Sequence, residues 1–309
     1  MRRVLLIACL CSATSALGYE ASTHQYLTFF AARHFNHCVT ETDIPRLTPL
    51  EVRYMARASA GVAETGFFLR MFRWNYYDPK GQSGKNLLWL VETRFHKHFN
   101  ELTEGLERTG DPVDAYRDLG RLLGYIQMVT SPAHAVPVFT ARFWRFSFSD
   151  RFDNHPVDEA GVELRMIDDC SFLEGAGDVP GESIQDVLVA TAERTIASVR
   201  ETIPGIPATW EAFWMPSRRG GDFGEYGDAG NSFGRRVEFR CGGAHARDLN
   251  EATQASDAGG STRQHCVLLN DDPLYDEFAL ARHVDAIRAS LRVMLIMQTG
   301  KRLSLPAVD

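Results

Sequence analysis

The sequence predicts an all-α fold, and three observations support this prediction. Apolar residues recur at spacings of three and four over several long stretches, helix-start signals precede those stretches, and few segments alternate with a period of two. We expect residues 1–18 to form a signal peptide and residues 19–309 a single multi-helix domain. Within that domain, residues 216–266 are expected to be a Gly-rich loop or insertion before the last helix.

The N-terminal residues have the features of a secretory signal peptide. Two arginines precede an apolar run from Val4 to Cys11, and small residues lead to Gly18. The run is too short to span a bilayer. Cleavage after Gly18 would make Tyr19 the amino terminus, and the protein would be secreted or periplasmic. The alternative is lipoprotein processing, which would leave Cys9 lipidated.

Caps followed by apolar stripes mark the first expected helices. Ser22-Thr23 precedes apolar residues at helical spacing, and Asp111-Pro112 is a cap followed by proline at the first helical position. The second of these helices carries one apolar stripe, which comprises Tyr116, Leu119, Leu122, Leu123 and Ile126. Ser131-Pro132 repeats the start signal, so His134 should lie in the first turn of a new helix.

Two longer helices are expected near the end of the chain. One runs from Ser183 to Ile203 and stops at Pro204, and the last begins at Asp272-Pro273 and ends at Gly300. The segment between them is rich in glycine, arginine and small polar residues. It has too few apolar residues for a core of its own, so it is expected to be a loop or an insertion.

Four cysteines follow the signal peptide, namely Cys38, Cys170, Cys241 and Cys266. An even number in an exported protein is compatible with one or two disulfides, and three full pairings are possible. We expect Cys241 to pair with Cys266, because they bracket a glycine-rich segment that would otherwise be loosely held. The alternative is four reduced, buried thiols.

The formal net charge of the chain is −7. Affinity for polyanions comes largely from lysine and arginine, so an acidic protein binds phosphate chains poorly without a local site. Nucleic acid is therefore disfavoured as a partner.

The most specific motif runs from Leu119-Gly120 through Gly124-Tyr125 and Met128 to Pro132-Ala133-His134. It resembles the helix and turn that hold metal ligands in the zinc-dependent phospholipase C and single-strand nuclease superfamily, where the pattern reads Leu-Gly-x-x-x-His-Tyr-x-x-Asp-x-x-x-Pro-x-His. The resemblance covers roughly residues 19–159. It implies the fold of that family and hydrolysis of phosphate esters, in which zinc activates a nucleophile and offsets developing charge.

The resemblance implies that one set of zinc ligands is kept. Tyr19, as the first mature residue, would chelate zinc through its amino group and carbonyl with the help of His24. His134 would hold one zinc together with His155 and Glu159, whose i,i+4 spacing can place both on one side of a helical turn. The implied cofactor is therefore zinc, with one ion as the expectation.

The same comparison implies that another metal site is lost. The residues at its ligand positions are Thr65, Asn75, Gly124 and Met128. A thioether and a missing side chain cannot replace a carboxylate and an imidazole as zinc ligands. Glu64 and Asp78 are then the nearest candidates for a catalytic general base.

Several other histidines are not expected to form a site. His96 and His98 are two residues apart, which favours solvated positions, and His283 lacks a partner at a useful spacing. His34 and His37 with Cys38 could bind a metal, but surface histidines and a disulfide cysteine are favoured as their explanation.

The sequence thus favours an exported zinc-binding phosphoesterase-like protein with a reduced metal site. Its partner would be a phospholipid or another phosphate ester, and the aromatic and basic segment 142–152 favours contact with a membrane surface over nucleic acid. That segment could equally contribute core rings and solvated arginines. The alternative function is a catalytically inactive family member reused as an envelope lipid- or protein-binding module, because two-metal hydrolysis cannot run with half its ligands. A third hypothesis is a different exported helical protein with an accidental similarity.

Overall fold

The structure is a computed structural model that describes residues 19–63, 77–78, 86–87, 91–92, 95–136, 138, 150–174, 182–217, 223–242 and 264–304. These residues are mainly helical, which confirms the expected class in its coarse form. The signal-peptide residues with Cys9, the candidate base Glu64, the positions Thr65 and Asn75, and most of segment 142–152 lie outside the described residues.

The described helices, in chain order, are α1 (Ala21–Cys38), α2 (Pro49–Ala63), α4 (Phe95–Arg108), α5 (Pro112–Met128), α6 (Pro132–Ala135), α7 (Glu159–Met166), α8 (Ile184–Val199) and α9 (Pro273–Ser304). Short 3-10 helices are η1 (Val39–Glu41), η2 (Phe152–Asn154), η3 (Ser171–Leu173) and η4 (Trp210–Ala212). Three antiparallel pairs join β1 (Asn86–Leu87) to β2 (Val91–Glu92), β3 (Trp214–Met215) to β4 (Glu225–Tyr226), and β5 (Val237–Cys241) to β6 (Gln264–Leu268).

Two helices begin at the caps expected from the sequence, whereas α1 begins at Ala21 with Glu20 at its N-cap position, so the expected cap at Ser22-Thr23 was wrong. The Asp111 carboxylate accepts a hydrogen bond from the Val113 amide (2.8 Å) at the start of α5. Ser183 and Asp186 form a reciprocal capping box at the start of α8. Each cap satisfies amide groups that the first helical turn leaves without partners, so these boundaries follow from local chemistry.

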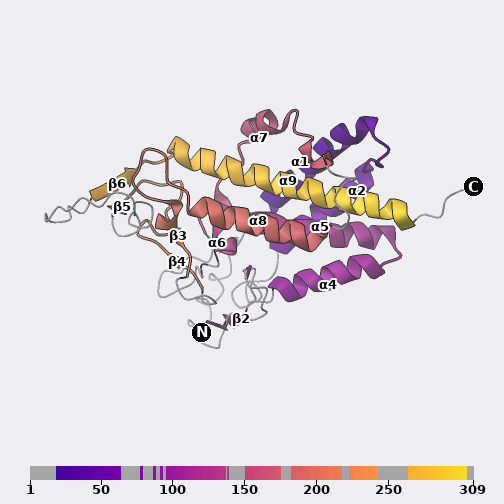
Figure 1. Ribbon diagram of the computed structural model, residues 1–309, viewed down its shortest axis with the longest axis horizontal. Coiled ribbons are helices and arrows are strands. Elements are labelled where there is room, and N and C mark those ends of the chain that lie inside the picture. Colours follow the sequence, from indigo (N-terminus) through magenta and orange to yellow (C-terminus); the bar gives the residue numbers. More distant parts are fainter. Residues whose placement is uncertain are drawn as a thin grey trace, which may run out of the picture.

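Helix α9 runs along the length of the molecule with α8 beside it, and α1 packs against both α2 and α9 (Figure 1). Helix α5 packs against α2 through its glycines. A Cβ added at Gly120 would overlap the Met55 carbonyl, and one added at Gly124 would lie 2.8 Å from Val62 Cγ2. The predicted apolar stripe of α5 is buried in the core. The absence of side chains at the two glycines therefore lets the backbones of α2 and α5 approach closely.

Two element boundaries and part of the Gly-rich segment differ from expectation. Helix α9 continues through Gly300, which does not adopt the positive φ that would end a helix, and α8 ends at Val199. Strands β4 and β5 and the start of β6 lie within residues 216–266, where a loop was expected. Cross-strand pairing supplies partners for their backbone groups without requiring a long apolar run.

Two disulfides are present among the described residues. Cys241–Cys266 joins β5 to β6, as predicted, and Cys38–Cys170 joins the end of α1 to the segment before η3. The alternative of four reduced thiols is therefore wrong. Disulfides are typical of proteins that mature in oxidising compartments, so both bonds fit an exported protein. No helix in the described parts of the chain is long and apolar enough to cross a membrane.

Candidate functional site

His134 lies in the first turn of α6, as predicted, and meets a carboxylate that the sequence interpretation missed. Its Nε2 atom is 3.5 Å from Oδ2 of Asp153, and the two side chains are 8% and 1% exposed. Ser131, expected only as a helix cap, donates its hydroxyl proton to Oδ1 of Asp153 (2.6 Å). The Asp153 carboxylate therefore links the turn before α6 to η2.

Tyr19 is fully buried beside this pair. Its hydroxyl lies 3.2 Å from Thr130 Oγ1, and it must be the donor because the Thr130 hydroxyl already donates to the Gln127 carbonyl (2.7 Å). Burial raises the pKa of the Tyr19 phenol well above its usual range. Tyr19 is therefore a neutral, fixed side chain, and its backbone nitrogen would become the amino terminus on cleavage after Gly18.

His24 is oriented by a hydrogen bond in the way that metal-binding histidines are. Its Nδ1 lies 2.8 Å from Oε1 of Gln127, while the Gln127 amide nitrogen donates to Thr28 Oγ1 (3.0 Å). Because Oε1 can only accept, Nδ1 carries the proton and Nε2 keeps a lone pair. Nε2 is buried and has no hydrogen-bond partner among the residues that the structure describes. Burial lowers the pKa of His24 to about 4, so the ring is neutral at pH 7.

A third buried histidine, His283 of α9, completes the surroundings of Tyr19. The ring centroid of His283 is 5.4 Å from that of Tyr19 and 6.2 Å from that of Phe152. Neither ring nitrogen has a hydrogen-bond partner within the described ranges. Burial lowers its pKa to about 3, with a contribution from His155. No sequence pattern indicates a role for this residue, because it occupies a core position on a long helix.

Asp150 adds a second buried carboxylate. It accepts hydrogen bonds from Trp214 Nε1 (2.9 Å), the Tyr226 hydroxyl (2.7 Å) and the Phe152 amide (2.9 Å). Burial, followed by the negative charge of Asp153, raises the pKa of Asp150 to about 6. Two carboxylates this close in a buried environment favour a neighbouring cation or a shared proton.

His155 and Glu159 occupy positions different from those that their spacing implied. Helix α7 begins only at Glu159, and His155 has an extended backbone (φ −73°, ψ 129°). His155 Nε2 lies 2.9 Å from Oδ1 of Asp276 on α9, and Glu159 is exposed. Pro156 explains this geometry, because a residue before proline is disfavoured in the helical conformation. The two residues therefore do not share one side of a helical turn.

Asp78 is buried near the turn that carries His134. The neighbouring Tyr77 amide donates to the His134 carbonyl (3.0 Å), and the backbone of Asp78 lies within hydrogen-bond distance of His96 Nε2 (2.9 Å to its oxygen). His96 is only 7% exposed and packs on Tyr77 and Phe95, so the expectation of a solvated His96 was wrong. Its burial also lowers its pKa.

Gly124 and Met128, two of the four positions where the resemblance implies a missing ligand, pack against other parts of the protein. Gly124 faces the Ser59 carbonyl and Val62 of α2, and Met128 is 1% exposed within the hydrophobic core. A histidine at Gly124 would collide with α2 at its Cβ atom. The contact between α2 and α5 thus excludes a ligand side chain from position 124.

The buried nitrogen and oxygen atoms of this cluster are of the kinds that bind zinc. Neutral imidazole nitrogen and carboxylate oxygen are common zinc ligands, and His24 has a free lone pair with its other nitrogen already oriented. Their atoms are not preassembled, however. In the described part of the chain, the group of three His, Cys, Asp or Glu residues with ligand atoms within 4.8 Å of one another is His34, Cys38 and Cys170. Side-chain movement would therefore have to accompany metal binding at His24 and His134.

No protein-family model, curated protein or solved structure matches this chain. The functional assignment therefore rests on the chemistry of the buried site.

Proposed function

We propose that this chain is an exported zinc-binding phosphoesterase-like protein with a reduced metal site. The observation that carries the proposal is the buried Asp153–His134 pair beside Tyr19 and His24. Burying ionisable groups costs desolvation free energy that an apolar core would avoid. Such costs are concentrated at functional sites, which favours a functional role for this cluster.

The proposed ligands are His24 through Nε2, His134, Asp153 and the amino group of Tyr19. Asp153 supplies the buried carboxylate that the sequence interpretation assigned to Glu159, which is exposed. A bound zinc ion would supply Lewis acidity toward a phosphate ester.

The residues around these ligands hold the site in position. Gln127 fixes the ring of His24, Ser131 fixes one oxygen of Asp153, and Thr130 fixes the hydroxyl of Tyr19. Asp150, with its pKa near 6, can hold or release a proton close to neutral pH. Hydrogen bonds of this kind hold reacting groups in the geometry that a reaction requires.

A phospholipid or another phosphate ester is the proposed substrate class. The acidic balance of the chain disfavours a nucleic acid, whose affinity would depend on many basic contacts. Phe152 is fully buried, so at least this ring of the aromatic segment belongs to the core and not to a membrane-binding surface.

A second candidate function is a binding module without catalysis. The close contact at Gly124 favours it, because that contact leaves no space for the histidine that the resemblance implies as a ligand of a second metal. Both functions require the same metal ligands, so metal content cannot distinguish them. Only a measurement of hydrolysis distinguishes one-metal catalysis from metal-supported binding.

The test uses the full chain expressed with its leader in an exporting host. We expect about one zinc per chain by elemental analysis, lost on His134→Ala or Asp153→Asn. It should be kept in two controls, His98→Gln at a partly exposed residue and Asp114→Asn at an exposed one. Hydrolysis of bis(p-nitrophenyl) phosphate and of phosphatidylcholine vesicles is then compared with the same variants. A fall of about 100-fold or more in the two site variants supports the phosphoesterase. Zinc without variant-sensitive hydrolysis favours the binding module, and oxidised protein without zinc rules out both.

A further inference from the structure

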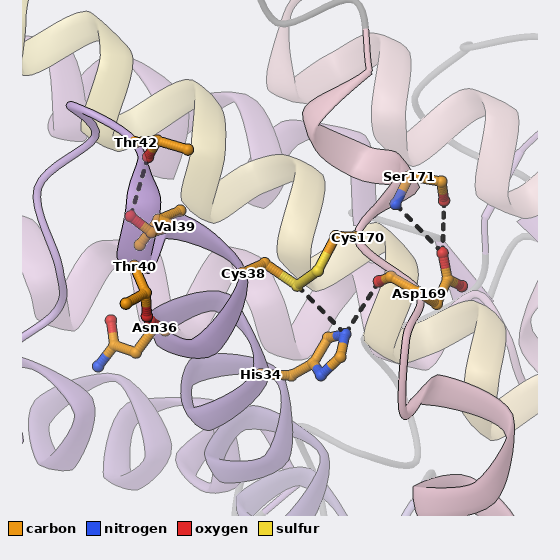
Figure 2. The surroundings of a disulfide bond; sticks show 9 residues. All are labelled: His34, Asn36, Cys38, Val39, Thr40, Thr42, Asp169, Cys170 and Ser171. Atoms are coloured by element: carbon orange, nitrogen blue, oxygen red, sulfur yellow. Dashed lines mark hydrogen bonds between the residues drawn. A yellow bond between two sulfur atoms is a disulfide. The ribbon is translucent and has the colours of Figure 1, made fainter.

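The Cys38–Cys170 disulfide is accompanied by an imidazole (Figure 2). Cys38 is the last residue of α1, and His34 lies one turn earlier on the same side of that helix. His34 Nε2 is 3.5 Å from Cys38 Sγ and 2.9 Å from the carbonyl oxygen of Asp169. Two sulfurs and one nitrogen thus lie together at the junction of α1 with the segment before η3.

We propose that reduction of this disulfide creates a binding site for a zinc-like divalent ion, with Cys38, Cys170 and His34 as ligands. In the described residues these are the three His, Cys, Asp or Glu side chains whose ligand atoms lie within 4.8 Å of one another. Thiolate sulfur and imidazole nitrogen are the ligands that zinc prefers, and three protein ligands leave one position open. This proposal is independent of the site at His134.

The oxidised and reduced forms differ in what the sulfurs can donate. In the disulfide they are bonded to each other and are not thiolates. A dithiol reductant transfers two hydrogens to the sulfurs and becomes a disulfide itself, which leaves two Cys thiols. Metal binding then releases both thiol protons and forms two metal–sulfur bonds. The 5.6 Å separation of the two Cα atoms keeps both sulfurs within reach of one ion.

Two anchors hold the Cys170 segment near α1 when the covalent link is open. Arg288 of α9 donates to the Asp169 carboxylate (2.7 Å), and Arg292 donates to the Phe172 carbonyl (3.1 Å). The same carboxylate also accepts hydrogen bonds from Ser171 (Figure 2). The Asp169 side chain is thereby occupied. Because the Asp169 carbonyl oxygen can only accept, His34 Nε2 carries the proton in the oxidised form, so coordination requires that this hydrogen bond is released and that the proton moves through solvent to Nδ1.

Exposure distinguishes this disulfide from the other. Cys38 and Cys170 are partly exposed, whereas Cys241 and Cys266 are each 7% exposed. A reductant and a metal ion therefore reach the Cys38–Cys170 bond more readily. Cys241–Cys266 provides a matched control within the same chain.

The test measures zinc bound by the full chain before and after reduction with a phosphine, which becomes the phosphine oxide and does not chelate the metal. We expect a gain of about one zinc per chain on reduction. The gain should disappear in His34→Gln and in the Cys38→Ser/Cys170→Ser variant. It should remain in Cys241→Ser/Cys266→Ser and in His98→Gln. Cobalt in place of zinc should give a thiolate charge-transfer band under the same conditions.

The contrary results are equally definite. If the reduced wild-type protein binds no more zinc than the oxidised protein, the proposal is overturned. This outcome does not depend on whether the variants fold, which circular dichroism checks. A gain that persists in His34→Gln, or that follows Cys241 and Cys266 instead, also overturns it. Zinc at the site of the proposed function is bound by the oxidised protein and depends on His134, so the two failures are distinguishable.

Discussion

Asp153 Oδ2 lies 3.5 Å from His134 Nε2, with the carboxylate 1% exposed and the imidazole 8% exposed. Ser131 holds the other carboxylate oxygen at 2.6 Å. Ser131 directly precedes α6, His134 lies in α6 and Asp153 lies in η2, so the carboxylate joins two parts of the chain as well as forming the proposed site. Its removal should therefore affect stability as well as any metal binding.

Asp153→Ala should destabilise the metal-free protein by about 3 kcal/mol, because it removes the acceptor of a buried hydrogen bond and the partner of a buried imidazole. Asp153→Asn should cost about 1 kcal/mol, since an amide keeps the shape and one acceptor oxygen. Urea unfolding at pH 7 with a chelator measures both, with the exposed Asp114→Asn as control. A loss in Asp153→Ala no larger than in that control would contradict the described contacts.

His283→Leu should make the protein less sensitive to acid. The folded-state pKa of His283 is about 3, below its ordinary 6.5, so the unfolded chain binds the proton first as pH falls. Stability is therefore lost from about pH 6.5 downward, and this group accounts for about 3 kcal/mol between pH 7 and pH 4. His24, with a pKa of about 4, acts in the same direction and is unchanged in the variant.

The measurement for His283 is the difference in unfolding free energy between pH 7 and pH 4 in both proteins. The variant should lose less stability than the wild type over this range. Equal losses of stability in the two proteins would show that His283 takes up a proton as readily in the folded protein as in the unfolded chain.

The glycines of α2 and α5 should respond oppositely to alanine. Gly124→Ala places a Cβ 2.8 Å from Val62 Cγ2, and Gly120→Ala overlaps the Met55 backbone. Each should destabilise the protein by about 1–3 kcal/mol through overpacking. At Gly61 no atom of the described residues, apart from the backbone of α2 itself and the chain neighbours of Gly61, lies within 4 Å of the added Cβ. Gly61→Ala should therefore stabilise α2 by up to about 1 kcal/mol.

Thermal unfolding of the three single variants checks these signs. Stabilisation by alanine at Gly124 would mean that α2 and α5 are farther apart than described.

Trp214→Phe should raise the pKa of Asp150 further above its value of about 6. Burial and the charge of Asp153 already raise it, and the indole hydrogen bond at 2.9 Å opposes them. The folded variant would hold the Asp150 proton at a higher pH. Its loss of stability, about 2 kcal/mol at pH 8, should therefore shrink as pH falls through 6, where a neutral carboxyl needs fewer donors.

Unfolding free energies of the variant and the wild type at pH 8 and pH 5 test this expectation. A loss of stability that is the same at both values would show that the indole does not act on a charged Asp150.

Local chemistry explains which parts of the fold were predictable. Asp111-Pro112, Ser131-Pro132 and Ser183 start helices because proline and capping side chains act on their immediate neighbours. The Cys241–Cys266 bond was predictable because the two cysteines enclose a segment that is poor in apolar residues.

The parts that depend on distant partners were not predictable in this way. Nothing near His283 in the sequence indicates that Tyr19 packs against it. Asp153 becomes a candidate site residue only through its contacts with Ser131 and His134, which are distant in the sequence. The helical spacing assumed for His155 and Glu159 ignored Pro156, although that proline was a usable local signal. Zinc binding, phosphoester hydrolysis and the family resemblance stay predictions.

The contact at Gly120 and Gly124 also bears on how the protein is made. Where an ion crosslinks two helices, the supply of that ion limits how much of the chain folds at all. Here α2 and α5 pack directly against each other, with Gly120 against the Met55 backbone and Gly124 against the Val62 side chain. Cells starved of zinc should therefore still accumulate normal amounts of this protein, and the zinc supply would affect only the activity proposed for the site at His134.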